Sequence, residues 1–483
     1  MKAIPFPQIV GPSYTLNSVN AECQRCVNMF VERIESNEGK NVYWLRPTPG
    51  LELFLTLPDS PIMRMIYTSV GRAFAITKNT LYEIYTDGTY TSRYSFSYSN
   101  DKVKVSDNGL GLLIAKQTTS YFFKFSDNTM ITSSSFVGSY LGGTFVDFLD
   151  QYLLVNRPST NQFQISPLAY NGSQTWDAAD VFSAESNADY ITGAIVNGRE
   201  YWLFGPNSYE VWFSTTDANR PFQRISDAAF NIGCVAPYTI EAISGNVFWL
   251  GGSKEGYGIV WMSQGYQPKR ISTFAIEQEL RAYNMLDDAE AYSYQLEGHF
   301  VYVLRFPSAG KTFNYDITTG LWFETEYRVP VYNTRLAHRA TGHIFAFSKN
   351  LVSDYSTGAI YTLSPSVYTD NTDPIVRYRR APTINKLGKR IFYEELMLEV
   401  ESGVGLASGQ GSNPLISVRW SNDSGHTWSN YHNKSIGAIG EYKKQVRFNR
   451  LGSAKDRTFE IYLSDPVPFK LITANLTVVE GAY

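Results

Sequence analysis

The feature that most constrains this chain is a repeated unit about 45 residues long. Each copy opens on a turn, usually at a glycine, and continues as two aromatic-rich alternating runs joined by a second turn. A repeat of this length is typical of β-propeller blades, which contain four short strands each. Seven copies predict six or seven blades, each copy supplying the inner hairpin of its blade. The copies start at Gly71, Gly109, Asp150, Gly198, Gly245, Gly298 and Gly342.

Composition supports an all-β fold. Aromatic residues make up 15% of the chain and charged residues only 18%, and aromatic side chains favour half-buried sheet surfaces. Closing aromatic-rich strands into a ring leaves few exposed sheet edges. A string of β-sandwiches is the alternative, but it predicts turns every 8–12 residues without a repeated head. The fold class expected is therefore a degenerate β-propeller with six or seven blades.

Two regions lie outside the repeats. Residues 1–60 carry many prolines, which remove backbone donors, and are expected to form an extended N-terminal arm. Residues 61–371 are assigned to the propeller, and residues 372–483 to a β-sandwich-like domain of about five strands. The run starting at Ile276 predicts one short helix. The tract from Gln24 is compatible with a helix or a strand.

Charge and cysteine usage exclude several classes of function. The net charge of −3 argues against a dedicated nucleic-acid binder, although not against a channel through which DNA slides. Cys23 and Cys26 form a CxxC, but a zinc site needs a second pair of ligands. With Cys234 the count is odd and low, as expected for folding in a reducing cytoplasm. Without a secretory signal or a long apolar stretch, we expect no membrane insertion. No cofactor or metal is expected.

A short motif near the C-terminus matches S-x-D-x-G-x-T-W and resembles the Asp-box of sialidases and related β-proteins. We expect a structural turn, in which Trp428 anchors the hairpin in the core. A sialidase-like enzyme remains a minor alternative, because no spacing singles out a catalytic set. The motif residues are Ser421, Asp423, Gly425, Thr427 and Trp428.

A basic run enters the C-terminal domain. It could contact DNA phosphates or an acidic neighbouring subunit, or it could be a charged linker and edge strand, which we favour. Its candidate contact residues are Arg377, Arg379, Arg380, Lys389 and Arg390.

The arm carries a more specific signature, with the form QR-x-VN-x-F-x-E followed by TPGL. It resembles the opening of the packaged-DNA stabilisation proteins, or tail nozzle proteins, of short-tailed bacteriophages. The motif residues are Gln24, Arg25, Asn28, Phe30, Glu32, Arg46, Pro49 and Gly50.

This resemblance implies a non-enzymatic virion protein that is assembled in the host cytoplasm and located in the phage tail. Such proteins form a homohexameric ring that docks on the head-to-tail adaptor beneath the portal. The ring retains packaged DNA, forms the channel for genome ejection, and contacts tail fibres or spikes and a plug or needle. DNA passes without sequence-specific binding. The arm is then expected to grip the adaptor or a neighbouring subunit.

The main alternative is a receptor- or glycan-binding propeller, whose exposed aromatic side chains could stack on sugars.

Overall fold

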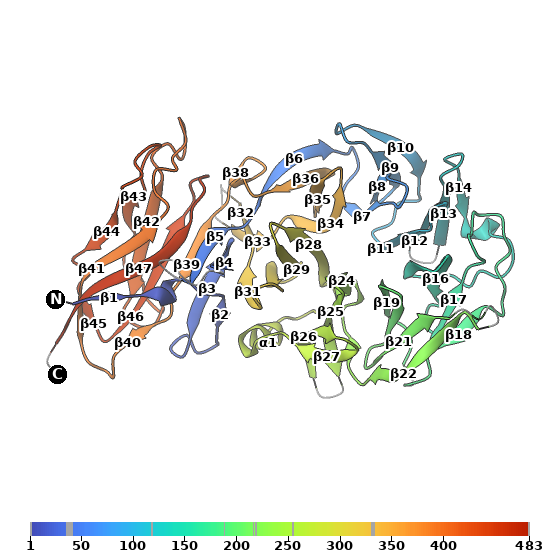
Figure 1. Cartoon of the computed structure of the whole chain (residues 1–483), viewed down its shortest axis with the longest axis horizontal. Helices are drawn as coiled ribbons and strands as arrows, with labels where there is room; N and C mark the ends of the chain where they lie inside the picture. Colours follow the sequence, from blue (N-terminus) through green and yellow to red (C-terminus); the bar gives the residue numbers. More distant parts are fainter. Residues whose placement is uncertain are drawn as a thin grey trace.

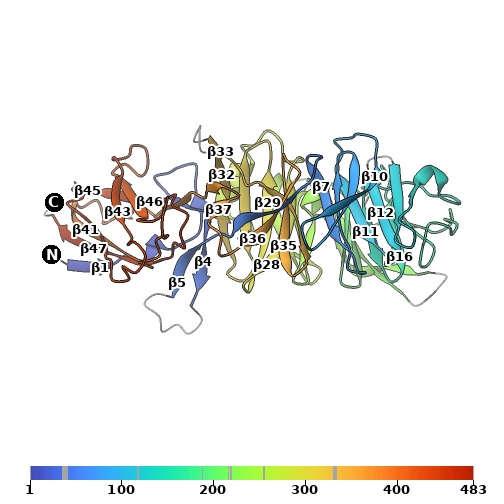
Figure 2. The same cartoon turned by 90° about the horizontal axis from the view of Figure 1, so that it is seen from above.

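The computed structural model describes residues 2–34, 42–116, 119–187, 189–215, 217, 220–253, 256–329 and 334–481. Two β-rich bodies lie side by side along the long axis, a propeller and a β-sandwich, with strands from the N-terminal region between them (Figure 1, Figure 2). The described part of the chain has one α-helix, α1 (Phe274–Leu280). This confirms the all-β prediction.

Seven four-stranded units make up the propeller within the described residues. The first three are β7 (Ile62–Tyr67), β8 (Ala73–Thr77), β9 (Thr80–Ile84) and β10 (Tyr90–Ser95); β11 (Val103–Asp107), β12 (Gly111–Lys116), β13 (Thr119–Lys124) and β14 (Met130–Thr132); β15 (Val146–Leu149), β16 (Tyr152–Asn156), β17 (Gln162–Ile165) and β18 (Val181–Ser183). The next three are β19 (Gly193–Asn197), β20 (Glu200–Phe204), β21 (Tyr209–Ser214) and β22 (Phe222–Phe230); β24 (Glu241–Ile243), β25 (Asn246–Ser253), β26 (Gly256–Gln264) and β27 (Gln267–Arg270), extended by β23 (Gly233–Cys234); β28 (Glu290–Leu296), β29 (His299–Phe306), β30 (Lys311–Asp316) and β31 (Leu321–Glu324). The seventh is β34 (Ala340–Ala346), β35 (Lys349–Asp354), β36 (Ala359–Ser364) and β6 (Gly50–Thr56), extended by β37 (Thr369–Asp370) and β38 (Asp373–Pro374).

The first strands of these units form a closed ring. Contacts run from β7 through β11, β15, β19, β24, β28 and β34 and back to β7, so the propeller has seven blades. The repeated heads fall at the turns after these strands in six blades, where Gly71, for example, has a φ of 81° that suits glycine. In these six blades the copies therefore supply the two middle strands, not the inner hairpin as expected. In the seventh blade Gly342 lies inside β34, and the turn is at Phe347–Ser348.

A strand from the N-terminal region closes the ring. β6 pairs antiparallel with β36, joining Gly50 to Ser364 and Thr56 to Ala359. The boundary expected at residue 60 is thus wrong for residues 50–56, which belong to the last blade. At the other end the propeller sheet continues to Pro374, close to the expected boundary at 371.

The C-terminal domain is a two-sheet sandwich, as predicted, but it includes most of the N-terminal region. One sheet contains β1 (Lys2–Pro5), β4 (Met29–Arg33), β5 (Tyr43–Pro47), β41 (Ile391–Val400), β44 (Val446–Asn449), β45 (Ser453–Ala454) and β47 (Leu471–Glu480). The other contains β2 (Tyr14–Thr15), β3 (Cys23–Val27), β39 (Arg377–Arg380), β40 (Ile384–Asn385), β42 (Leu415–Ser421), β43 (His432–Ser435) and β46 (Asp456–Leu463).

The prediction that residues 1–60 form an extended N-terminal arm is therefore wrong. Phe6, Ile9 and Met29 are buried in the same core as Leu396 and Ile461 of the sandwich, so the N-terminal strands complete this domain. The tract from Gln24, left open from sequence, is β-strand. β3 also touches β31 of the sixth blade, through a parallel pairing of Val27 with Glu324. One continuous sheet therefore joins the propeller to the sandwich.

Shorter elements connect these sheets. Helix α1 lies between the fifth and sixth blades, where Thr273 caps it by accepting a hydrogen bond from the Ile276 N–H. The predicted helix thus exists but begins two residues earlier. The hairpin of β32 (Glu326–Val329) and β33 (Thr334–Ala337) joins the sixth and seventh blades. Three 3₁₀ turns complete the described elements: η1 (Pro7–Ile9), η2 (Ser133–Ser135) and η3 (Pro237–Thr239).

Candidate functional site: the seam and the bore

The arm motif lies where the N-terminal strands, the sixth blade and the sandwich meet; we call this place the seam (Gln24, Arg25, Asn28, Phe30, Glu32, Arg46, Pro49, Gly50). Asn28 is at its centre, buried, with a φ of 54°. Its Nδ2 donates to the carbonyls of Glu326 (3.0 Å) and Val376 (2.8 Å), and its Oδ1 accepts from the Glu326 N–H (2.9 Å). Asparagine tolerates this left-handed backbone better than most residues. One side chain therefore links the propeller hairpin to the segment that enters the sandwich.

An ion pair lies next to Asn28. The Arg25 Nε donates to Glu324 Oε1 at 3.1 Å, and Lys311 lies 3.4 Å from Glu324 Oε2. Burial alone would raise the pKa of Glu324, but Arg25 and Lys311 together lower it to about 2. The carboxylate is therefore charged at all physiological pH values and connects β3 to the sixth blade.

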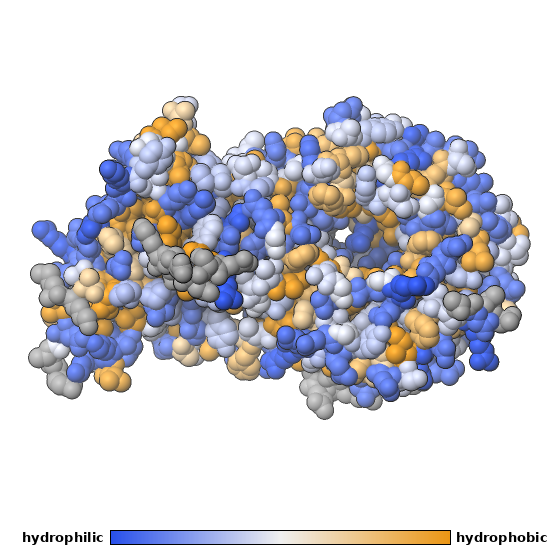
Figure 3. All heavy atoms as spheres, viewed as in Figure 1, coloured by the Kyte–Doolittle hydropathy of each residue, from blue (hydrophilic) through white to orange (hydrophobic). Residues whose placement is uncertain are grey.

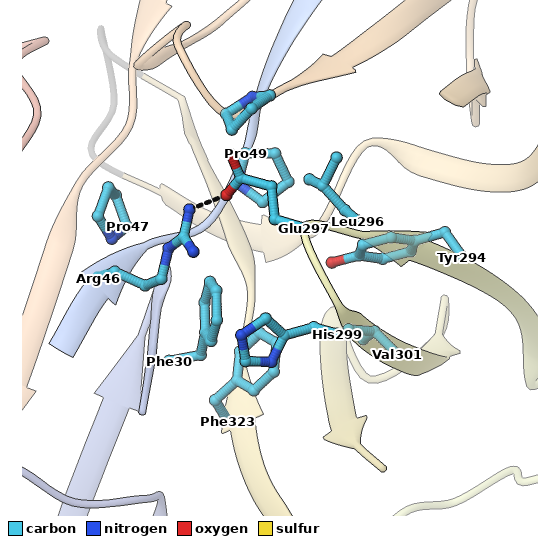
Figure 4. Close-up of a pocket in the computed structure, with 11 residues that line it drawn as sticks. Phe30, Arg46, Pro47, Pro49, Tyr294, Leu296, Glu297, His299, Val301 and Phe323 are labelled. Carbon is cyan, nitrogen blue, oxygen red and sulfur yellow. Dashed lines mark hydrogen bonds and ion pairs between the residues drawn. The ribbon is translucent and has the colours of Figure 1, made fainter. Parts of the chain in front are cut away.

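Phe30 and Arg46 form the outer part of the seam (Figure 4). The Phe30 ring packs at 5.0 Å from His299 and 5.6 Å from Phe323, both on the sixth blade. Arg46 covers this ring at 5.3 Å and pairs with both Glu32 and Glu297. The pocket enclosed here is about 20 Å³, which suits roughly one water molecule. This contact is a packed joint and offers no room for a substrate.

Gly50 lies where the chain turns from the seam into the last blade. A Cβ at this position would lie 2.4 Å from the Val367 carbonyl oxygen, so only glycine fits. The Gly50 N–H donates to that same oxygen at 3.0 Å. Pro49, just before it, lines the seam pocket.

The basic run is mostly internal. Arg379 is fully buried and donates to the carbonyls of Gln8, Ile9 and Pro12 and to Gln24 Oε1, at 2.7 to 3.0 Å. Burial lowers its pKa to about 10, so it remains charged. This side chain holds the first residues of the chain on the sandwich.

Arg377 is also buried, and Arg380 pairs with Glu460. Arg377 and Arg379 therefore cannot contact DNA or a neighbour from these positions, and that part of the prediction is wrong. Lys389 is half-buried, whereas Arg390 is exposed and donates to Ser453.

The bore of the propeller is bridged by side chains. Arg64 on the first blade lies 3.8 Å from Glu241 on the fifth, and Lys102, just before the second blade, pairs with Glu290 on the sixth. These blades are not neighbours in the ring, so both pairs cross the bore. Figure 3 shows only a narrow opening at the propeller centre. A double helix cannot pass through this opening while the pairs are intact.

The bore is also a low-dielectric environment. Lys104 lies over the rings of Phe145 (5.2 Å) and Tyr238 (5.5 Å). Burial and the nearby Arg64 lower the pKa of Lys104 to about 8. Burial raises the pKa of Asp147 to about 6, although this carboxylate accepts the Val196 N–H at 2.6 Å. Polar and aromatic side chains thus line the bore around its narrow opening.

Comparison with protein families identifies the chain. A model described as "Bacteriophage P22 Gp10, beta-propeller" matches residues 17–368, and one described as "Bacteriophage P22 Gp10, beta-sandwich" matches residues 377–479. The chain belongs to the bacteriophage P22 Gp10 family. This is the tail nozzle and DNA-stabilisation family of short-tailed phages, so the chain is a structural phage tail protein, located in the virion and assembled with other virion components.

A search of curated proteins finds no significant match. Solved structures similar to this P22 Gp10 family member include the WD40 propeller domain of Doa1, at 10% identity, covering 65% of this chain and 97% of that one, with a TM-score of 0.39. Another is the extracellular domain of the putative one-component system BT4673 from B. thetaiotaomicron, at 11% identity, covering 87% and 61%, with a TM-score of 0.44.

The Asp-box motif forms a closed local turn in this P22 Gp10 family member. Asp423 accepts from the Ser421 and Thr427 hydroxyls (both 2.6 Å) and from the Thr427 N–H (2.8 Å), and these bonds hold the pKa of Asp423 well below its usual range. Gly425 has a φ of 104°. Trp428 is not in the core, contrary to expectation. It is half-buried, and its ring packs against the guanidinium groups of Arg380 and Arg419.

The cysteines of the CxxC lie buried on β3. Cys23 faces the Thr383 hydroxyl, and the Cys26 thiol donates to the Met29 carbonyl at 3.2 Å. Burial raises the pKa of the Cys26 thiol to about 12, which keeps it protonated and unreactive. No group of metal-binding side chains occurs in the parts of the chain that the structure describes, and no helix there is long and apolar enough to cross a membrane.

Sequence reasoning missed the residues that bridge the bore. Arg64, Lys102, Glu241 and Glu290 carry no motif. Their only sequence signal is a charge at or just before an innermost strand, which becomes visible once the blade register is known.

Proposed function

We propose that the chain forms the nozzle of a short-tailed phage tail as a homohexameric ring docked under the head-to-tail adaptor. In this position it retains packaged DNA and surrounds the path of genome ejection. Its outer surfaces contact tail fibres or spikes, and its lower end a plug or needle. The match to both P22 Gp10 models, over residues 17–368 and 377–479, carries this proposal.

In the proposed ring, DNA passes along the axis between copies and not through the bore of each propeller. The pairs Arg64–Glu241 and Lys102–Glu290 support this path, because they join opposite sides of the bore. A net charge of −3 supports it too, since a channel that released DNA readily would bind phosphates weakly.

The seam is proposed to keep the propeller and the sandwich in one orientation. The buried bonds of Asn28 and the pair of Arg25 with Glu324 support this role. A ring that meets its neighbours through two different faces needs a fixed angle between its domains to close. The arm motif then serves assembly indirectly, and docking falls to surfaces other than the motif.

Depletion of the chain during phage growth tests the proposal. Particles made without it are expected to package DNA and then lose it, so that the DNA becomes nuclease-sensitive. Complementation with the intact chain should restore protection, and gold-labelled antibody should mark the lower tail. Particles that lack the chain yet keep nuclease-resistant DNA would contradict the proposed role.

A further inference from the structure

An arginine-rich cluster covers one face of the sandwich sheet. In three adjacent strands, Arg380 of β39 lies opposite Glu460 of β46, which lies opposite Arg419 of β42. Glu460 has no exposed surface and accepts from Arg419 Nε (2.7 Å) and Arg380 Nη2 (3.2 Å). The hydroxyls of Tyr378 and Tyr431 also donate to it. One buried carboxylate therefore fixes two guanidinium groups.

Aromatic rings hold the same two guanidinium groups from the side. The Trp428 ring lies 4.9 Å from the Arg380 guanidinium carbon and 4.8 Å from that of Arg419. The Tyr431 ring lies 4.6 Å from that of Arg419. Stacking of this kind favours planar guanidinium groups over lysine. We call Arg380, Arg419, Glu460, Trp428 and Tyr431 the arginine clasp.

The clasp has donors left over. Both arginines bind Glu460 through Nε and Nη2, and the Nη1 of neither donates to a residue within the described ranges. Two positive charges face one negative charge, so the clasp has a net charge of +1. Arg419 is 25% exposed, Arg380 16% and Tyr431 43%. Preorganised donors that reach solvent can bind another anion at little entropic cost.

We propose that the arginine clasp binds a carboxylate side chain presented by an acidic segment of a partner protein. A planar guanidinium pairs with a carboxylate through two parallel hydrogen bonds, and Tyr, Trp and Arg are the residues most enriched at the centres of protein interfaces. The claim concerns this surface alone and does not depend on the hexamer or on the path of the DNA.

Charge favours a protein partner over DNA. Tight binding to a phosphate backbone needs many uncompensated cations. Next to the clasp, Glu324 pairs with Arg25 and Lys311, the latter also held by Glu279, while Glu326 pairs with both Arg328 and Arg335. The clasp and Arg335 therefore leave a charge of only +2, which one or two carboxylates match and which is too small for tight binding to a run of phosphates.

Fluorescence anisotropy with the full chain tests the proposal. The probe is a fluorescein-labelled peptide of alternating glutamate and glycine, and its comparisons are the glutamine–glycine peptide and a labelled single-stranded oligonucleotide. The chain is expected to bind the glutamate peptide and neither comparison. Loss of a charge-assisted hydrogen bond pair in Arg419→Gln should weaken this binding about tenfold or more.

Two further variants make the result decisive. Arg447→Gln is the matched control, because Arg447 is an exposed arginine paired with Glu395 on the other sheet, and its binding should be unchanged. Arg419→Lys keeps the charge opposite Glu460 and so protects folding, but it should recover only part of the binding. Equal affinity in Arg419→Lys, Arg447→Gln and the parent chain would overturn the proposal. So would stronger binding of the oligonucleotide, or no binding of the glutamate peptide at millimolar concentration.

Discussion

Asn28→Ala offers the sharpest test of the seam. The substitution removes three hydrogen bonds and leaves the Glu326 N–H and the carbonyls of Glu326 and Val376 without this partner. Each buried group left unpaired costs about 1–2 kcal/mol. Alanine at a φ of 54° adds about 1 kcal/mol. The expected loss in the free energy of unfolding is therefore about 4–7 kcal/mol, measured by guanidinium denaturation.

Two control variants separate the contributions. Asn371→Ala changes an exposed asparagine with a φ of 61°, so it should show only the backbone cost of about 1 kcal/mol. Asn28→Gly removes the hydrogen bonds without the backbone strain and should fall about 1 kcal/mol short of Asn28→Ala. If Asn28→Ala and Asn371→Ala destabilise the chain equally, the seam does not depend on these bonds and the reasoning fails.

Three further predictions follow from the same contacts. Glu324→Gln should lower the free energy of unfolding by about 3 kcal/mol near neutral pH. Because the pKa of Glu324 is lowered to about 2 from a usual 4.5, the difference from the parent chain should be full above pH 4.5 and should close as the pH falls toward 2. A difference that does not change with pH in a series of denaturation experiments would contradict the pairing. Gly50→Ala should destabilise the closure of the propeller by about 1–3 kcal/mol, measured by thermal unfolding. Gly342→Ala is the control and should cost less, because its Cβ would meet only the flexible Ser353 hydroxyl at 3.2 Å. Equal effects of the two substitutions would count against β6 as the closing strand. Asp423→Ala should speed hydrogen exchange at the Thr427 amide, since it removes the acceptor of that N–H. Unchanged protection at Thr427 would show that the turn is held by other contacts.

Local patterns in the sequence predicted the repeating part of the fold. Heads such as Gly71 and Gly298 have positive φ at the first turn of their blades, and a turn that needs glycine leaves a mark in the sequence. The strands after each head alternate and are rich in aromatic residues, so counting the copies narrowed the propeller to six or seven blades, and the ring of contacts shows seven. The sandwich and the short helix were predictable for the same reason, because strand and helix periods are local.

Pairing between segments that are far apart in the sequence has no local sequence signature of this kind. β6 closes the ring by pairing with β36, a strand about 310 residues later in the chain. The sequence near Gly50 does not indicate which strand β6 pairs with. Arg379 belongs to a basic run that suggested an exposed contact surface. In the structure it is buried and donates hydrogen bonds to the carbonyls of Gln8 and Ile9. Asn28 was recognised through its family motif, but its internal role depends on Glu326 and Val376, which only the fold brings together.

Cryo-electron microscopy of intact virions tests the central claim most directly. The account predicts six copies of this chain around the lower tail, with DNA density on the ring axis and none in the bores bridged by Arg64–Glu241 and Lys102–Glu290. DNA density inside a propeller bore, or a tail that lacks this chain, would contradict it.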